Sequence, residues 1–284
     1  MRSRVLLAIL LASLMITGTV APPAAEARYR PTTGMDWFSH DQEIQAGQQA
    51  AAQVNRQMPV LPDSDPISRY VQRLGTGLAA HAPGDGWPYS FHVVNVKEIN
   101  AFALPGGPIF VNMGTIQAAD NEAQLAGVMA HEISHVVQRH ATRAATKQLM
   151  ARAPLQVLGG LLGRSLGGQL AQYGISFGLG SYFLRNSRQN ESEADLIGTD
   201  IMYDTGYDPR QMAVFFEKLE GQSGNRSGLA QFLSDHPNPG NRARAVSDEV
   251  ATLRPKSYRQ DSAEFRQIKQ TVMARKPASS SRNR

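Results

Sequence analysis

The sequence predicts an α+β fold in which helices dominate. Three observations lead to this prediction. Apolar residues recur at three- and four-residue spacing, helix-start signals precede several segments, and one short region has the alternation and turn residues of strands. The chain has 284 residues, of which 42% are hydrophobic, so we expect one large domain or two small ones rather than wholesale disorder.

The predicted helices follow one another in chain order. Residues 41–57 are rich in Gln and Ala, and Ser64-Asp65-Pro66 begins a second helix because proline fits a first turn. The apolar residues of that second helix are Ile67, Tyr70, Val71, Leu74 and Leu78. Asp120-Asn121 caps a long helix that runs to about residue 147. Later helices are expected over 190–203, from residue 208 onward, and over 241–253.

The predicted strands lie between the second and third of these helices. Residues 89–96 alternate enough for one strand, and residues 100–112 are typical of two strands around a Pro-Gly-Gly turn. We therefore expect a small antiparallel sheet beside the long helix that begins near residue 120.

The first 27 residues differ from the rest in composition. Arg2 and Arg4 precede an uncharged apolar run over 5–21, and Ala25-Glu26-Ala27 matches a small-x-small cleavage pattern. Residues 1–27 are therefore predicted to be a cleaved signal peptide, which makes the periplasm the expected compartment. An uncleaved membrane anchor is the alternative, although the run is short for a span.

The formal net charge of +5 is unevenly distributed. Residues 254–284 contain nine Lys or Arg against two acidic residues, whereas 28–253 is slightly acidic. We assign 28–253 to the folded body and 254–284 to a basic, partly disordered tail. The tail is expected to be solvated, with weak contact to an anionic surface as the alternative. No nucleic-acid motif accompanies it, so no nucleic-acid partner is expected.

The stretch 154–184 is apolar but rich in glycine. So many glycines are unfavourable in a packed helix, and Gln169 and Gln172 interrupt what would otherwise resemble a membrane span. We expect a lid-like segment that touches a membrane or a misfolded protein. A plain core element is the alternative.

The chemistry centres on one pentapeptide. The chain has no cysteine, which excludes disulfides, thiol catalysis and cysteine-based metal sites, so any metal must be held by His, Asp or Glu. His131-Glu132-Ile133-Ser134-His135 is an H-E-x-x-H motif. Because positions four apart share a helix face, both imidazoles can reach one metal ion, and Glu132 can reach a water on that ion. On a continuous helix His140 points to the opposite side, so it is predicted at the surface.

A third ligand is needed, because two histidines leave zinc short of one protein ligand and one open position. Glu191 and Asp195 are four residues apart and share a helix face. We predict that Glu191 binds the metal and that Asp195 accepts the outer N–H of a motif imidazole. Glu193 is predicted to point away. The alternative is an acidic first turn favoured by the helix dipole.

These residues carry a family resemblance. H-E-I-S-H, the later E-x-E-A-D and the preceding N-A-F-A-L-P-G-G resemble the HtpX/prenyl-protease-like gluzincin metallopeptidases over roughly residues 35–250. The similarity is strongest to their soluble periplasmic branch, which includes outer-membrane quality-control proteases. It implies a zincin-like domain with one zinc ion per chain, held by His131, His135 and Glu191, and Glu132 as the base.

The resemblance also singles out His236. The family has a C-terminal His-Pro followed by an arginine, and this chain has Asp235-His236-Pro237 with Arg242 and Arg244 after it. In that pattern the histidine stabilises an oxyanion or caps zinc as a fourth, inhibitory ligand. A loop histidine before a turn is the simpler alternative. The helical-repeat domain that ends one branch of the family is not expected here, because the tail is too short for one.

Together these features predict a periplasmic zinc endopeptidase. Glu132 would take a proton from zinc-bound water and deliver it to the leaving amine, and the strand at Asn100, Ala101, Phe102 and Ala103 would pair with an extended substrate. Expected substrates are unfolded or misassembled envelope proteins, with contact to the outer membrane or its assembly machinery. The alternatives are a zinc-capped chaperone or assembly factor and a membrane-anchored protease.

Overall fold

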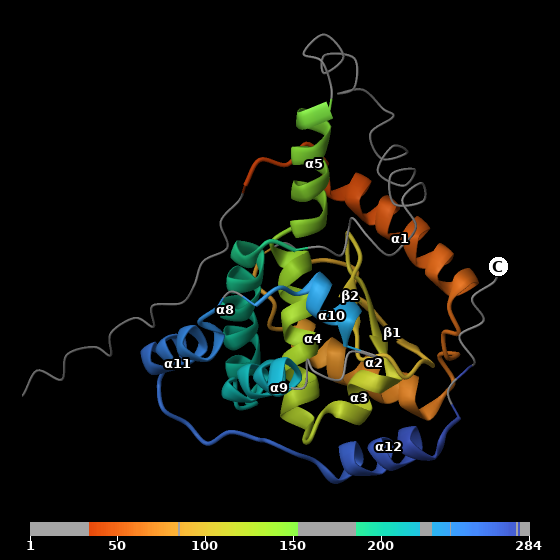
Figure 1. Cartoon of the computed structure of the whole chain (residues 1–284), viewed down its shortest axis with the longest axis vertical. Helices are drawn as coiled ribbons and strands as arrows, with labels where there is room; N and C mark the ends of the chain where they lie inside the picture. The colour runs from red at the N-terminus through yellow and green to blue at the C-terminus, as the bar shows by residue number, and fades with distance from the viewer. Residues whose placement is uncertain are drawn as a thin grey trace, which may run out of the picture.

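The computed structural model describes residues 34–84, 86–152, 186–221, 229–238, 240–276 and 278. The predicted signal peptide and the glycine-rich stretch 154–184 lie outside these residues. Helices and strands follow in the order α1 (His40–Gln57), α2 (Pro66–Ala79), β1 (Ser90–Val94), β2 (Ala101–Ala103), β3 (Pro108–Asn112), α3 (Met113–Ala118), α4 (Glu122–Val137), α5 (His140–Arg152), α8 (Arg188–Thr205), α9 (Arg210–Gly221), α10 (Ala230–Asp235), α11 (Arg242–Thr252) and α12 (Ala263–Ala274). The predicted α+β fold with a majority of helix is confirmed (Figure 1).

The predicted helix starts are made by the side chains that signalled them. Asp65 accepts a hydrogen bond from the backbone N–H of Ile67 at the start of α2, with Pro66 in the first turn. Asn121 accepts one from the backbone N–H of Gln124 at the start of α4. Both caps satisfy backbone donors that a helix start leaves without a partner.

The sheet has three strands in the order β1-β3-β2. The predicted hairpin is present, because β2 pairs antiparallel with β3 around the Pro-Gly-Gly turn. However, β1 pairs parallel with β3, so the sheet is mixed rather than antiparallel throughout. The reason is the order of the strands: the chain leaves β1, passes to the far edge to form β2, and returns as β3 between them. As a result β2 is an outer strand, and it contacts α4.

Helix α4 lies at the centre of the molecule (Figure 1), and it contacts α2, α8, α9 and β2. Every residue from Glu122 to Val136 is buried, including its polar ones. A helix buried on all sides gains its stability from packing rather than from an amphipathic face. Polar side chains on such a helix must find partners inside the protein, because water does not reach them.

Helix α1 packs against the turn that joins β2 to β3. A Cβ atom at Gly47 would lie 1.7 Å from the carbonyl oxygen of Pro105, which no side chain can tolerate. Glycine at this position therefore lets α1 approach the turn closely. The contact places α1 beside the end of the outer strand.

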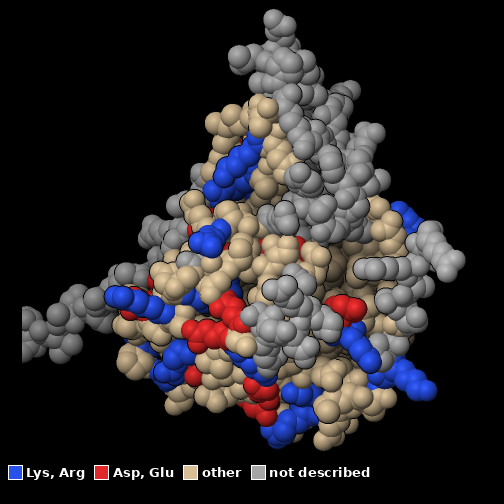
Figure 2. All heavy atoms as spheres, in the orientation of Figure 1, with Lys and Arg blue, Asp and Glu red and all other residues tan. Residues whose placement is uncertain are grey.

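The folded body extends beyond residue 253, the boundary predicted above. Phe265, Ile268 and Val272 of α12 are buried in the same apolar core as α4, and α12 contacts α2 and α3. Helix α12 carries both basic residues and, at helical spacing, the apolar residues that pack into the core. A count of charges alone does not reveal these apolar residues. On the face shown in Figure 2, Lys/Arg and Asp/Glu are interspersed over the lower part of the molecule.

Within the described ranges, none of the helices is both long enough and apolar enough to span a membrane.

Candidate metal centre

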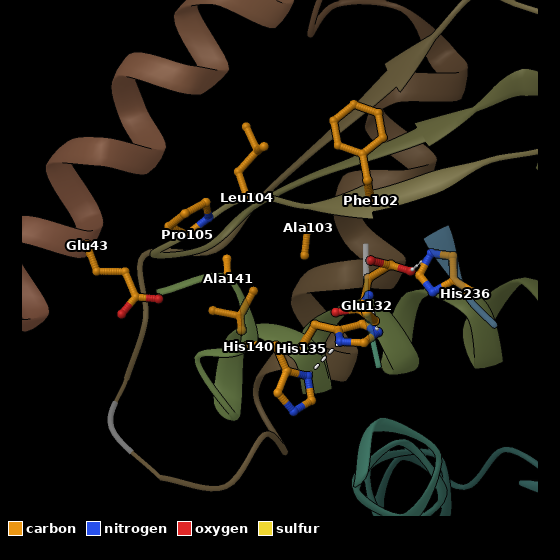
Figure 3. Close-up of a pocket in the computed structure, with 12 residues that line it drawn as sticks. Glu43, Phe102, Ala103, Leu104, Pro105, Glu132, His135, His140, Ala141 and His236 are labelled. Carbon is orange, nitrogen blue, oxygen red and sulfur yellow. Dashed lines mark hydrogen bonds and ion pairs between the residues drawn. The ribbon is translucent and has the colours of Figure 1, made fainter. Parts of the chain in front are cut away.

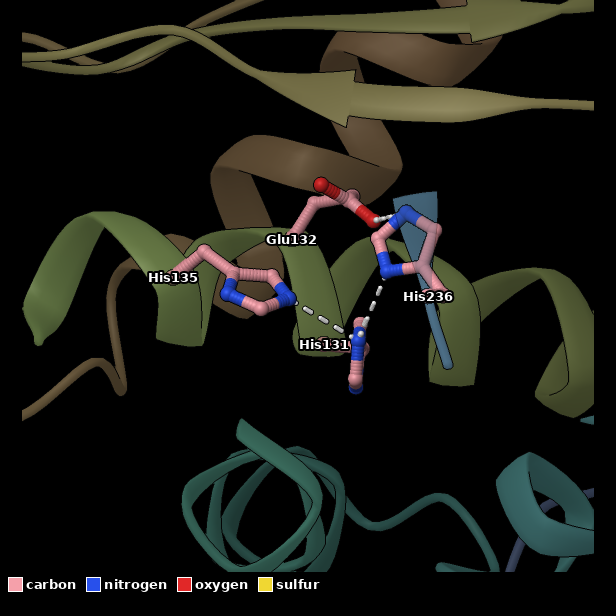
Figure 4. Close-up of side chains that lie close together, drawn as sticks. All are labelled: His131, Glu132, His135 and His236. Atoms are coloured by element: carbon pink, nitrogen blue, oxygen red, sulfur yellow. Dashed lines mark hydrogen bonds and ion pairs between the residues drawn. The ribbon is translucent and has the colours of Figure 1, made fainter. Parts of the chain in front are cut away.

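The two histidines of the H-E-x-x-H motif lie on one face of α4, as their spacing predicts. Nε2 of His131 and Nε2 of His135 are 3.0 Å apart, and both side chains are buried (Figure 4). Glu132 projects from the neighbouring face of the same helix toward β2, where the nearby backbone N–H of Ala103 favours the ionised form of its carboxylate.

Glu191 reaches the two imidazoles from the first turn of α8. Its Oε2 lies 3.1 Å from Nε2 of His131, and its Oε1 lies 3.4 Å from Nε2 of His135. Close packing of the two helices makes this reach possible. Gly198 of α8 packs against α4 at this point, since a Cβ atom there would lie in van der Waals contact, 3.4 Å from the backbone nitrogen of His131.

His236 enters the same centre from the end of α10. Its Nδ1 lies 3.4 Å from Nε2 of His131 and 3.3 Å from Oε2 of Glu191. Its Nε2 lies 3.4 Å from Oε1 of Glu132 and 3.5 Å from the carbonyl oxygen of Ala101. The ring therefore bridges the histidine cluster and the outer strand (Figure 4).

These donor atoms have the spacing that a tetrahedral cation requires. Zinc bonds of about 2.0–2.2 Å place neighbouring ligand atoms roughly 3.3 Å apart, and the separations within the cluster run from 3.0 to 3.4 Å. In the described part of the chain, Oε1 of Glu191 and Oε1 of Glu132 accept no hydrogen bond although both are buried. A cation would compensate such carboxylates. The residues fit a zinc ion held by His131, His135 and Glu191.

Burial and neighbouring charges shift the pKa values of the groups in the cluster. Burial raises the pKa of Glu132 to about 7. Burial also acts on Glu191, but His236 and His131 outweigh it and hold the pKa of Glu191 well below its usual range. Burial alone would lower the pKa of His131, whereas Glu191 and Asp195 raise it to about 9. The ionised carboxylate of Glu191 thus faces the protonated imidazole of His131 inside the protein. On binding, a metal ion would replace the proton on His131.

The outer nitrogen of His131 is held by Asp195. Nδ1 of His131 lies 3.0 Å from Oδ1 of Asp195, the contact that the spacing in α8 predicts. Arg242 of α11 closes this side: its Nε donates to Oδ2 of Asp195 at 2.6 Å, and its Nη2 donates to Oε2 of Glu191 at 3.1 Å. The guanidinium also lies 4.1 Å over the ring of Phe216. Arg242 is therefore the arginine after the His-Pro pair that contacts the site.

The prediction that His140 lies at the surface is wrong. Helix α4 ends at Val137, Arg139 adopts a left-handed conformation with φ of 54°, and α5 begins at His140. This turn brings Nδ1 of His140 to 2.7 Å from Nδ1 of His135 (Figure 3), and only 2% of His140 is exposed. The prediction failed because it extended one straight helix through residues 138–139.

Glu193, for which the sequence predicts only that it points away from Glu191, has a buried partner of its own. Its Oε2 lies 3.2 Å from Nε2 of His140, and the residue is buried. Glu193 does face away from Glu191, but α5 folds back to meet it. No residue type in the sequence signals this contact.

The predicted substrate strand borders a pocket beside these groups. Ala101 and Ala103 direct backbone groups toward His236 and Glu132, as described above, and Nδ2 of Asn100 lies 3.5 Å from Oδ2 of Asp235. Phe102 instead stacks on Phe110 in a second apolar cluster. The residues that line the pocket are Glu43, Phe102, Ala103, Leu104, Pro105, Glu132, His135, Val136, His140, Ala141, Asn186 and His236 (Figure 3).

Glu43 of α1 is a lining residue that the sequence did not single out. It is buried, Nε of Arg139 donates to its Oε2 at 2.6 Å, and burial raises its pKa to about 7. This pair ties α1 to the turn between α4 and α5.

Two histidines four residues apart on one helix, a glutamate from a second helix and a glutamate beside the first histidine define a metallopeptidase centre. The comparison with protein families agrees, since the model described as Peptidase family M48 matches residues 67–250. The chain belongs to this family.

Several curated proteins are similar in sequence to this chain. The "Beta-barrel assembly-enhancing protease" of Escherichia coli (strain K12) is 36% identical over 261 residues, which are 88% of this chain and 53% of the relative. The protein of the same name from Yersinia pestis is 33% identical over 265 residues, 88% of this chain and 54% of the relative. The "Mitochondrial metalloendopeptidase OMA1" of Schizosaccharomyces pombe is 33% identical over 190 residues, 66% and 55% of the two chains. The chain thus spans about half the length of the curated relatives it matches.

Proposed function

We propose that this chain is a periplasmic zinc-dependent endopeptidase that hydrolyses peptide bonds of unfolded or misassembled envelope proteins. The observation that carries the proposal is the convergence of His131, His135 and Glu191, at separations of 3.0 to 3.4 Å, beside the buried carboxylate of Glu132. The names of the bacterial relatives support an envelope role, and the family supports hydrolysis of peptide bonds.

Zinc, when bound, lowers the pKa of water and polarises the scissile carbonyl. Glu132 is the proton carrier in this proposal. It is buried between the histidine cluster and β2, and the nearby N–H of Ala103 favours its ionised form. A pKa near neutrality lets the group accept a proton from the attacking water and return it to the leaving amine.

His236 has two roles open to it. Its Nε2 lies between Glu132 and the carbonyl of Ala101, where it could donate a hydrogen bond to a developing oxyanion. Its Nδ1 lies within ligand spacing of His131 and Glu191, where it would close the fourth position on a metal. That second contact favours a capped resting state, so a zinc-capped assembly factor with little proteolysis is the second candidate function.

The outer strand β2 is the proposed substrate platform. An extended peptide that pairs with the outer edge of β2 would be held through main-chain hydrogen bonds, which confer affinity with little sequence preference. Asn100, Ala101, Phe102 and Ala103 contribute through the backbone in this proposal, because Phe102 is packed into the protein. Weak sequence preference suits a protease that recognises unfolded chains.

One experiment separates the two candidates. Zinc content and degradation of an unfolded protein are measured for the wild type, Glu132→Gln and His236→Ala. The endopeptidase proposal expects one zinc per chain in all three and a loss of about 10²- to 10⁴-fold in turnover for Glu132→Gln. Full turnover in Glu132→Gln, with autolysis controlled, overturns the role of Glu132. An inactive wild type together with an active His236→Ala supports the capped assembly factor.

The periplasmic location and the envelope partners rest on residues 1–27 and on the relatives. Fractionation of cells that express the full chain tests the location: a mature protein in the periplasmic fraction, shortened by the signal peptide, is the expected result. Retention of the uncleaved chain in the membrane fraction would favour the anchored alternative.

A further inference from the structure

The two motif histidines, His131 and His135, differ in the group that contacts the ring nitrogen on the side away from the metal site. His131 contacts a carboxylate directly, since Asp195 lies 3.0 Å from its Nδ1. His135 contacts a third imidazole, since Nδ1 of His140 lies 2.7 Å from its own Nδ1. His140 lies on the opposite side of the His135 ring from the metal-binding nitrogen, so it belongs to the surroundings of a ligand rather than to the ligand set (Figure 3).

A carboxylate completes this second arrangement. Oε2 of Glu193 lies 3.2 Å from Nε2 of His140, and Oε1 of Glu193 accepts a hydrogen bond of 2.9 Å from Nε2 of Gln189. Nη1 of Arg143 lies 3.6 Å from Oε2 of the same carboxylate. His135, His140 and Glu193 are all at least nine-tenths buried, so water does not compete for these contacts.

The chain of contacts determines where the protons reside. An ionised carboxylate only accepts, so Nε2 of His140 must carry the hydrogen that faces Glu193. The Nδ1 of a neutral His140 then has a lone pair and accepts. The Nδ1 of His135 must therefore donate, which leaves the lone pair of His135 on Nε2, where it faces Glu191 and His131. This is the tautomer that metal ligation by Nε2 requires.

We propose that His140 and Glu193 are positioning residues that fix the tautomer and ring orientation of His135 for metal binding. The inference rests on the proposed metal centre and adds to it a relay from Glu193 through His140 to His135. The relay corresponds to the direct contact between Asp195 and His131, except that His140 stands between the carboxylate of Glu193 and His135. The residues come from α4, α5 and α8, so the relay also fixes α5 to the centre.

The first test measures zinc affinity in the full chain by competition with a chromophoric chelator. His140→Leu fills the space but removes the acceptor, and it is expected to weaken zinc binding about 10- to 100-fold, the usual effect of losing an outer partner. His140→Gln supplies an amide oxygen that can accept from Nδ1 of His135 and is expected to retain more affinity than His140→Leu. Glu193→Gln is expected to lose less than His140→Leu. His81→Gln alters an exposed histidine and is the matched control.

The second test reads the tautomer itself. Long-range ¹H–¹⁵N spectra of the zinc-free chain are expected to show His135 protonated on Nδ1 in the wild type and a mixture of tautomers in His140→Leu. A role for His140 in packing alone would leave the His135 tautomer unchanged. Where His140→Leu does not fold, His140→Gln and Glu193→Gln are compared with His81→Gln by the same spectra.

The outcomes are distinct. Zinc affinity and a His135 tautomer that match the control in all the His140 and Glu193 variants overturn the relay, even if the wild type degrades proteins. A wild type that binds zinc and shows the predicted tautomer, with loss of both in the variants, supports the relay even if the wild type does not hydrolyse peptides. Failure of the relay and failure of the proposed function are thus observed separately.

Discussion

The two sides of the metal centre differ in what surrounds them. On the His131 side, Asp195, Arg242 and Phe216 from three different helices enclose an imidazole with no exposed surface. On the His135 side the imidazole lines the pocket, and its outer contact comes from the turn after its own helix. One side is therefore built into the core, whereas the other depends on a local turn and borders the pocket beside the proposed substrate strand.

The largest effect is expected where the two sides meet, at Glu191. Glu191→Gln removes a carboxylate that contacts both motif histidines and Arg242. Zinc affinity is expected to fall by more than the roughly 100-fold upper range for an outer partner, because a direct ligand is lost. Chelator competition measures the loss. Glu217→Gln, an exposed glutamate on α9, is the control. Wild-type affinity in Glu191→Gln would contradict the predicted ligand set.

The next largest effect is expected at Arg242, and it tests whether the groups around His131 are part of the protein core. Arg242→Met removes the guanidinium that contacts two buried carboxylates and is expected to cost about 3–5 kcal/mol of unfolding free energy in the zinc-free protein. Arg244→Met, two residues further on, alters an exposed pair with Asp248 and is expected to change stability by less than about 1 kcal/mol. Urea denaturation in the presence of a chelator compares them. Similar midpoints for the two variants would show that Arg242 does not support this side.

The smallest effect concerns pH and the His135 side. Glu43 anchors the turn through Arg139, faces Asp36 and Thr142, and has a pKa raised to about 7 by burial. The folded protein therefore holds a proton that the unfolded chain releases near its ordinary pKa of 4.5. The free energy of unfolding is then highest below pH 4.5 and falls as the pH rises from 4.5 toward about 7, by at most about 3 kcal/mol.

Glu43→Gln removes this titration and is expected to flatten the stability profile between pH 4.5 and 7. Urea midpoints across this range for the wild type and Glu43→Gln provide the measurement. An unchanged slope in the variant would assign the pH dependence to other groups.

The parts of the structure that follow local rules were predictable. The hairpin around Pro-Gly-Gly, the caps at Asp65 and Asn121, and the meeting of Glu191 and Asp195 with the motif histidines all follow from spacing and residue type. Helix α12 was predictable in principle, because Phe265, Ile268 and Val272 have helical spacing, but its basic residues drew the interpretation toward a tail.

The rest depends on tertiary contacts that no short pattern encodes. Residues 138–139 contain neither glycine nor proline, so nothing local signals the end of α4. The left-handed backbone of Arg139 is held by its bonds to Glu43 and to the carbonyl of Phe38, both of which come from the N-terminal part of the body. His140 and Glu193 could be placed only once that turn was known. The parallel pairing of β1 with β3 likewise depends on strand order rather than on strand sequence.

The close contact between Gly47 and Pro105 has a consequence for how such enzymes diversify. Helix α1 precedes the region 67–250 that the family model matches, yet it abuts the turn that ends the outer strand. The helices that carry the metal-centre residues and the helix that lines the pocket through Glu43 are thus separate segments of the chain. A substitution in α1 can therefore reshape the wall of the pocket while the residues of the metal centre stay the same.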